Sequence, residues 1–142
     1  MFGIGIENHK YRDNIGTLAR SAVNLGANIL FTIGNKYKRT KADTIKAEKH
    51  LDILNFDNIY EFLLFCFEND FSTVGIEISS DAEDIRKFQH PVKSMYILGH
   101  ENSGLSKLMI DNCRYKVQIP SNYCMNVSVA GAVVMYDRLI KG

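Results

Sequence analysis

The chain has 142 residues, a length that suits one domain with a buried apolar core. Hydrophobic residues make up 46% of it and charged residues 23%, the ordinary balance of a soluble globular protein, and no apolar run is long enough to span a membrane. The formal net charge is only +1, but residues 51–85 hold nine acidic residues and no Lys or Arg, so the bases are concentrated in residues 1–50 and 86–142.

The cysteines and histidines indicate neither a disulfide framework nor a metal centre. Cys66, Cys113 and Cys124 are odd in number and lack the paired spacing of zinc ligands. The four histidines are scattered along the chain. No signal peptide precedes the first strand-like segment, so we expect a cytoplasmic protein with no bound metal and no membrane contact.

Apolar strand-like segments alternate with helical patterns along the chain. We expect strands at Phe2–Ile6, Asn28–Ile33, Thr73–Ile78, Ser94–Leu98 and Tyr115–Ile119, and helices at Asn14–Leu25, Asp57–Glu68, Ser103–Ile110 and Met125–Ile140. Asp13 or Asn14 is expected to cap the first helix, and Gly26 follows its end. The alternation predicts one α/β domain over residues 1–142, with a mostly parallel sheet and helices on both faces. Ligands of such folds bind beyond the carboxyl ends of the strands.

The densest group of bases follows the second predicted strand. Lys36, Lys38, Arg39 and Lys41 surround Tyr37 there. Lysine and arginine side chains bind nucleic acid phosphates and release the counterions condensed on them. A solvated loop would have the same composition, so both interpretations stay open at this point.

Three polar segments follow predicted strands. In Asn14-Ile15-Gly16-Thr17-Leu18-Ala19-Arg20, an amide and a guanidinium at a helix start suit a polar or anionic ligand, although a capped surface helix would fit as well. In Gly99-His100-Glu101-Asn102-Ser103-Gly104, two glycines allow the backbone to approach a ligand closely. In Ile119–Ala130, proline stops a strand, and Asn126 and Ser128 open a helix as capping residues commonly do. Each segment alone is compatible with a structural loop.

Taken in this order, the segments resemble the signature motifs of the SpoU family, within the SPOUT superfamily of RNA methyltransferases. Asn14, Gly16 and Arg20 are similar to the family's N-x-G-x-x-x-R motif. Gly99, Glu101 and Gly104 are similar to its G-x-E-x-x-G motif. The resemblance covers nearly the whole chain.

The third segment is similar to the I-P…S-[LM]-N-V-S-V-A motif of that family. It ends in Cys124-Met125-Asn126-Val127-Ser128-Val129-Ala130. Cys124 stands where the family usually has serine, and the stretch from Pro120 to Cys124 is shorter than in most members. A thiol is a weaker hydrogen-bond donor than a hydroxyl, so the detailed contacts of this loop are expected to differ.

The resemblance implies a Rossmann-like sheet whose C-terminal third forms a deep trefoil knot, with S-adenosylmethionine as the cofactor. The cofactor-binding residues it implies lie in three loops, and main-chain groups at Gly99 and Ile119 hold the adenosine. The full set is Ile76, Gly99, Glu101, Gly104, Ile119, Cys124 and Met125.

The resemblance also implies methylation of a ribose 2′-hydroxyl by a homodimer whose sites combine residues of both chains. Arg20 would be the main catalytic residue, with Asn14 and Asn126 positioning it and the nucleotide. RNA would be bound by Arg20 together with Lys36, Lys38, Arg39 and Lys41. The substrate is expected to be tRNA rather than rRNA.

Two alternatives follow from the same residues. Cys124 and the short loop would also suit a catalytically inactive RNA-binding accessory protein with the same fold. An unrelated nucleotide-binding α/β enzyme would require the three motifs to be a coincidence, and such an enzyme would lack the knot.

Overall fold

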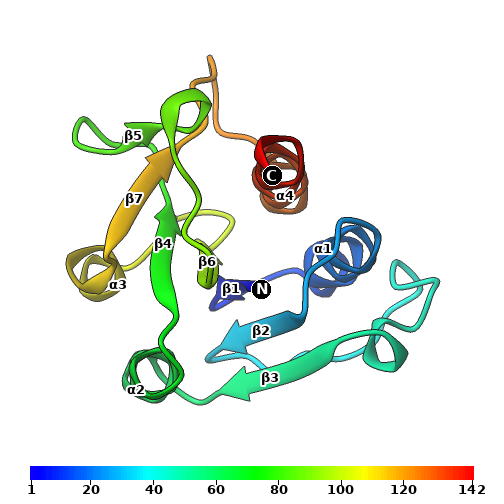
Figure 1. The fold of residues 1–142 in the computed structure, drawn as a ribbon. Helices are drawn as coiled ribbons and strands as arrows, with labels where there is room; N and C mark the ends of the chain where they lie inside the picture. The colour runs from blue at the N-terminus through cyan, green and yellow to red at the C-terminus, as the bar shows by residue number, and fades with distance from the viewer.

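The computed structural model describes residues 1–142 as a seven-stranded sheet between two helix layers (Figure 1). Neighbouring strands are all parallel and follow the order β3-β2-β1-β6-β4-β7-β5. Their bounds are β1 Phe2–Glu7, β2 Ile29–Ile33, β3 Asp52–Phe56, β4 Ser72–Ile76, β5 Glu83–Asp84, β6 Ser94–Leu98 and β7 Tyr115–Gln118. Every residue of the central strands β1 and β6 is buried, as expected for strands covered on both faces.

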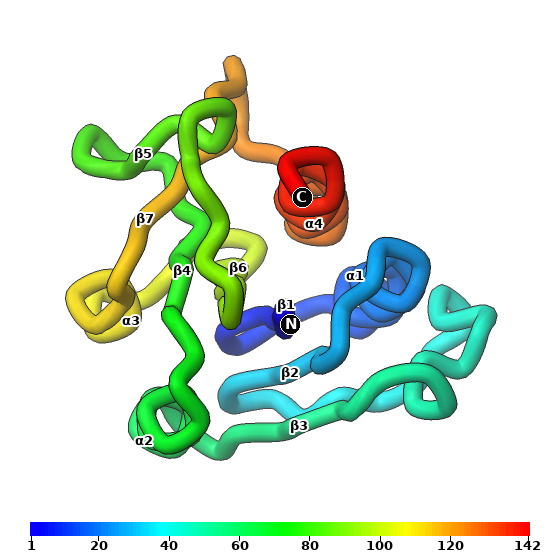
Figure 2. The backbone as a smooth tube through the Cα atoms, viewed as in Figure 1, coloured from blue at the N-terminus to red at the C-terminus, as the bar shows by residue number.

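The helices divide between the two faces of this sheet (Figures 1 and 2). One apolar cluster joins α1 and α4 to the sheet, and another joins α2 and α3 to its other face. The bounds are α1 Arg12–Asn24, α2 Ile59–Glu68, α3 Lys107–Asn112 and α4 Val127–Lys141, with short 3₁₀ turns at Ala47–Lys49 and Ile85–Lys87. None of the helices combines the length and apolar character needed to cross a bilayer.

The predicted α/β class and the five predicted strands agree with the structure, but several boundaries differ. The helix predicted from Ser103 begins only at Lys107, where the Ser106 hydroxyl accepts a hydrogen bond from the backbone N–H of Met109. The preceding loop is instead a tight turn, in which the backbone of His100 and that of Gly104 exchange two hydrogen bonds.

The predicted cap of the first helix was wrong. Asp13 and Asn14 lie inside the first turn of α1, and the residue at the cap position is Tyr11, which makes no side-chain capping bond. The cap is supplied from elsewhere: Glu101 accepts hydrogen bonds from the backbone N–H groups of Lys10 (2.8 Å) and Tyr11 (3.0 Å). The first turn is therefore held by a loop distant in sequence.

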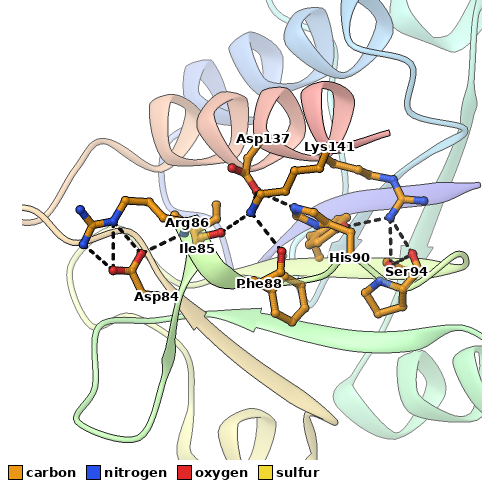
Figure 3. Close-up of polar contacts among 11 residues, drawn as sticks. Asp84, Ile85, Arg86, Phe88, His90, Ser94, Asp137 and Lys141 are labelled. Atoms are coloured by element: carbon orange, nitrogen blue, oxygen red, sulfur yellow. Dashed lines mark hydrogen bonds and ion pairs between the residues drawn. The ribbon is translucent and has the colours of Figure 1, made fainter.

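A network of polar contacts fixes the C-terminal end of α4 against the segment before β6 (Figure 3). The His90 ring lies 2.6 Å from the Tyr96 hydroxyl and 2.7 Å from the Asp137 carboxylate. Lys141 pairs with Asp137 at 2.8 Å, and Arg138 donates to the Tyr96 hydroxyl at 3.0 Å. Burial, together with the charges of Lys141 and Arg138, lowers the pKa of His90 against the opposing effect of Asp137. His90 thus links α4 to the sheet.

Two small residues of α4 pack inside their own chain. Ser128 and Gly131 are buried. A Cβ added at Gly131 would collide with the Leu18 side chain of α1, so glycine permits the close approach of α1 and α4. The exposed side of α4 is apolar instead, with Val129, Tyr136, Leu139 and Ile140 between 49% and 63% exposed.

Candidate active site

A cavity of about 280 Å³ opens where β4, β6 and β7 end. This is the edge of a parallel sheet at which ligands usually bind. Its wall contains all seven residues expected to bind the cofactor: Ile76, Gly99, Glu101, Gly104, Ile119, Cys124 and Met125. The fold therefore brings together three loops that lie far apart in sequence.

The loop between Gly99 and Gly104 folds back on itself at the cavity. A Cβ at Gly99 would collide with the backbone of Gly104 and Leu105. Gly104 has φ +72°, a conformation that L side chains rarely adopt. At Gly99 the glycine permits contact within the loop, whereas close approach to a ligand was expected. This compact turn presents backbone groups and the Glu101 side chain next to the cavity.

A chain of hydrogen bonds connects the three motifs. The Asn14 amide donates to Glu101 Oε2 at 3.0 Å, and the Asn126 amide donates to Asn14 Oδ1 at 3.1 Å. Asn126 Oδ1 in turn accepts from the backbone N–H (2.9 Å) and hydroxyl (2.5 Å) of Ser128, and so caps α4. The capping role expected for Asn126 is present, and Ser128 is its partner.

Glu101 is held in the ionised form by its donors. Burial raises the pKa of its carboxyl, but hydrogen bonds from Asn14 and from the backbone of Lys10 and Tyr11 outweigh burial and lower the pKa. A carboxylate that accepts several hydrogen bonds is a poor proton acceptor. Glu101 therefore has the geometry of a residue that orders the loop and Asn14.

The basic residues lie on a loop whose backbone is fixed and whose cations face solvent. Lys36, Lys38, Arg39 and Lys41 are all exposed and form no ion pair. The Asp43 carboxylate anchors the loop by accepting hydrogen bonds from the backbone N–H of Ala47 (3.0 Å) and from the Tyr37 hydroxyl. Burial, aided by the bond to Asp43, raises the pKa of Tyr37.

Gly16 packs against this basic loop. It is buried in α1, and a Cβ there would lie 2.5 Å from Thr40 Oγ1 and 3.2 Å from Ala42 Cβ. Because Gly16 has no side chain, the basic loop can pack on α1 at this point, two residues after Asn14.

Within one chain, no hydrogen bond links Arg20 to Asn14 and Asn126, the other expected catalytic residues. It lies on α1, is exposed, and its guanidinium forms no hydrogen bond or ion pair. It is not part of the cavity wall, whereas Asn14 and Asn126 are bonded to each other.

Two carboxylates that sequence reasoning missed hold the cavity loop in place. Glu7 is buried and accepts from the backbone N–H (2.8 Å) and hydroxyl (2.6 Å) of Ser106. Glu77 accepts from the backbone N–H of Leu105 at 2.8 Å. Each sits at the carboxyl end of a parallel strand, and that position was the available signal. No cluster of three or more His, Cys, Asp or Glu side chains is arranged to hold a metal ion.

Comparisons with known proteins agree with this geometry. The profile of the SpoU rRNA Methylase family matches residues 1–136. A provisionally named TrmH family tRNA/rRNA methyltransferase of Staphylococcus aureus is 25% identical over 132 residues, which cover 87% of this chain and 52% of that protein. The chain thus spans about half the length of the curated relatives it matches.

Solved structures share the fold. The SpoU methyltransferase AviRb of Streptomyces viridochromogenes superimposes with a TM-score of 0.90 at 22% identity, covering 99% of this chain and 59% of AviRb. AviRb in complex with the cofactor AdoMet gives a TM-score of 0.85 at 21% identity, covering 98% and 57%. A structure concerned with the 2-OH methylation of C/U34 on tRNA gives 0.79 at 19% identity, covering 97% of this chain and 93% of the other.

Proposed function

Because the chain belongs to the SpoU rRNA methylase family, we propose that it is an S-adenosylmethionine-dependent RNA methyltransferase that modifies a ribose 2′-hydroxyl. The observation that carries this proposal is the meeting of three distant motifs at one end of the sheet. Seven expected cofactor residues line one cavity, and Glu101, Asn14 and Asn126 form one chain of hydrogen bonds beside it.

The cavity suits S-adenosylmethionine in size and lining. Its volume of about 280 Å³ is close to the lower end of small-molecule sites, roughly 300 Å³. Half of its 16 lining residues are hydrophobic, which suits an adenine ring, while the backbone at Gly99 and Ile119 offers hydrogen bonds to the adenosine. When bound, the cofactor supplies an electrophilic methyl group. This group departs from the positively charged sulfur as a new O–C bond forms to the ribose.

The chain's own residues position the ribose and stabilise charge. A guanidinium is effectively never deprotonated in proteins, so Arg20 stabilises the negative charge that develops on the 2′-oxygen and takes no proton. The hydroxyl proton passes to a phosphate of the RNA itself. Asn14 and Asn126 fix each other and orient the nucleotide beside the cavity.

Arg20 acts in the site of a second protomer. In its own chain it is exposed and outside the cavity wall. α4, which packs against α1, leaves Val129, Tyr136, Leu139 and Ile140 uncovered, and a homodimer formed through this stripe buries them. Such a dimer brings α1 of each protomer to its partner.

RNA phosphates contact the basic loop. Lys36, Lys38, Arg39 and Lys41 have no protein partner to release on binding, and Asp43 holds the loop in shape. We propose tRNA as the substrate class and the cytoplasm as the location. The structure concerned with C/U34 on tRNA supports this choice, because this chain covers 93% of that protein.

The C-terminal third is proposed to form the trefoil knot of the family. The position of β7 supports this: it lies between β4 and β5, which are joined directly by residues 77–82 (Figure 2). After β6, the chain passes through α3 to that inner position and then continues into α4.

Transfer of labelled methyl groups to purified tRNA and rRNA, followed by nucleoside mapping, tests the proposed reaction. We expect a 2′-O-methylated nucleoside from tRNA. Label in rRNA alone would correct the substrate class, and label on a base would refute ribose methylation. RNA binding without any transfer would favour an inactive accessory protein.

Mixed dimers test the shared site. One chain carries Arg20→Ala, and the other carries Cys124→Trp, which fills the cavity from an exposed position. If Arg20 serves the partner, the mixture regains activity, because one of its two sites has an open cavity and an intact arginine. If Arg20 serves its own chain, the mixture stays inactive.

A further inference from the structure

The cavity wall holds a carboxylate that the proposed reaction leaves unused. Glu77 follows directly after β4. Both Glu77 and Glu101 line the cavity. No Lys or Arg is part of this wall. The lining is therefore acidic, which favours a ligand that carries positive charge.

The two carboxylates differ in how many of their oxygens accept hydrogen bonds. Both oxygens of Glu101 accept hydrogen bonds, from Lys10, Tyr11 and Asn14. Glu77 Oε2 accepts from the backbone N–H of Leu105 at 2.8 Å, while Glu77 Oε1 accepts no hydrogen bond. Glu77 is thus the acidic group of the wall that has an oxygen available to a ligand.

The Glu77 carboxylate is also fixed in place. A Cβ at Gly104 would lie 2.6 Å from its Oε2 and 3.1 Å from its Oε1, so it packs directly against the turn of the cavity loop. Leu105, whose N–H it accepts, is buried at 5% exposure. A charge held rigidly in a partly enclosed wall acts on a ligand more strongly than a mobile surface charge.

We propose that Glu77 determines ligand specificity by favouring the positively charged sulfonium of S-adenosylmethionine over the neutral thioether of the product; this rests on the proposed function. Methyl transfer moves a CH₃ group to the ribose oxygen and leaves the C–S electron pair on sulfur, so sulfur loses its charge. The ammonium and carboxylate of the methionine end are unchanged. The attraction of Glu77 for the sulfur position therefore exists before transfer and ends with it, which promotes exchange of product for fresh cofactor.

Calorimetric titration of the whole chain with three ligands tests this. S-adenosylmethionine carries a sulfonium, sinefungin carries an amine in its place, and S-adenosylhomocysteine carries neither. Glu77→Gln keeps an acceptor oxygen for the Leu105 N–H but removes the charge. Glu83→Gln changes an exposed residue of β5 outside the cavity wall, removes the same charge and serves as the matched control.

We expect Glu77→Gln to weaken binding of the two cationic ligands about tenfold, or about 1.4 kcal/mol, and binding of the thioether less than about twofold. Glu83→Gln should change none of them. The wild-type chain should bind S-adenosylmethionine and sinefungin more tightly than S-adenosylhomocysteine, a measurement that needs no variant.

Equal weakening of all three ligands by Glu77→Gln, or a wild-type chain that shows no preference for the two cationic ligands, would overturn the role of Glu77 while leaving cofactor binding intact. If the wild-type chain binds none of the three ligands, the proposed function itself fails, and this inference fails with it.

Discussion

Glu101 offers the sharpest test of the site, because one side chain holds two of the three motifs together. It accepts hydrogen bonds from the backbone of Lys10 at 2.8 Å, the backbone of Tyr11 at 3.0 Å and the Asn14 amide at 3.0 Å. The substitution Glu101→Gln keeps the size of the side chain. It replaces one acceptor oxygen with an NH₂ group, which then faces a donor.

The cost follows from these contacts. Whichever way the Gln amide turns, at least one donor at the start of α1 loses its acceptor, because Oε1 serves Lys10 and Oε2 serves Tyr11 and Asn14. Hydrogen bonds to a charged group are worth about 1.5–3 kcal/mol each, and partial exposure brings the expected loss to about 1–2 kcal/mol. For a chain of this size, that loss lowers Tm by about 2–8 °C.

Thermal unfolding as a function of pH separates the loss of these hydrogen bonds from a steric effect of the new side chain. Hydrogen bonding keeps the pKa of Glu101 below its ordinary 4.5 in the folded protein. Its stabilising contribution is therefore complete above the unfolded-state pKa and is lost as pH falls through the lower folded-state pKa. Wild type and Glu101→Gln should differ in Tm at pH 7 and converge in acid, whereas Glu83→Gln should match wild type at pH 7. An equal Tm for wild type and Glu101→Gln at pH 7, to within about 1 °C, would refute this reasoning.

Three further predictions concern the site and the RNA surface. Arg20→Ala should lower the single-turnover rate by about two to three orders of magnitude without changing cofactor affinity, and Arg20→Lys should restore little; more than about a tenth of the wild-type rate in the alanine variant would contradict a catalytic role. Replacing Lys36 and Lys38 with alanine should weaken RNA binding and reduce the salt slope by about one unit per lost phosphate contact, as filter binding at several salt concentrations measures, and an unchanged slope would reduce the loop to a solvated surface. Cys124→Ser should keep both Tm and cofactor affinity, because Cys124 is exposed and a new hydroxyl there stays hydrated; a clear drop in Tm would show that the short loop depends on the thiol.

The middle of the sheet could be predicted from sequence because its strands are uniformly apolar and bounded by turns. Ser94–Leu98 agrees residue for residue with β6. β3 and β5 were missed for different reasons. Asp52 and Asn55 are exposed on β3, which lies at the edge of the sheet and lacks a continuous apolar run. β5 has two residues, too few for any periodicity.

The candidate site residues could be predicted from motifs, but their bonding partners could not. Local propensity assigned Asn14 to a cap, whereas its amide bonds to Glu101, 87 residues away, and to Asn126, 112 residues away. Sequence spacing contains no information on such pairings, because they arise only when parallel strands align their carboxyl ends. The role of Arg20 is harder still to predict, because Arg20 does not line the cavity of its own chain.

The position of β1 at the centre of the sheet has a consequence for synthesis of the protein. β1 pairs with β2 on one side and with β6 on the other. Both edges of residues 2–7 are therefore hydrogen-bonded only after residues 94–98 have been synthesised. A nascent chain that has emerged only as far as β3 can form β1, α1, β2 and β3, but it exposes a long apolar strand edge to the cell. Pairings across such distances form slowly, so we expect the emerging N-terminal half to depend on chaperones until β6 has left the ribosome.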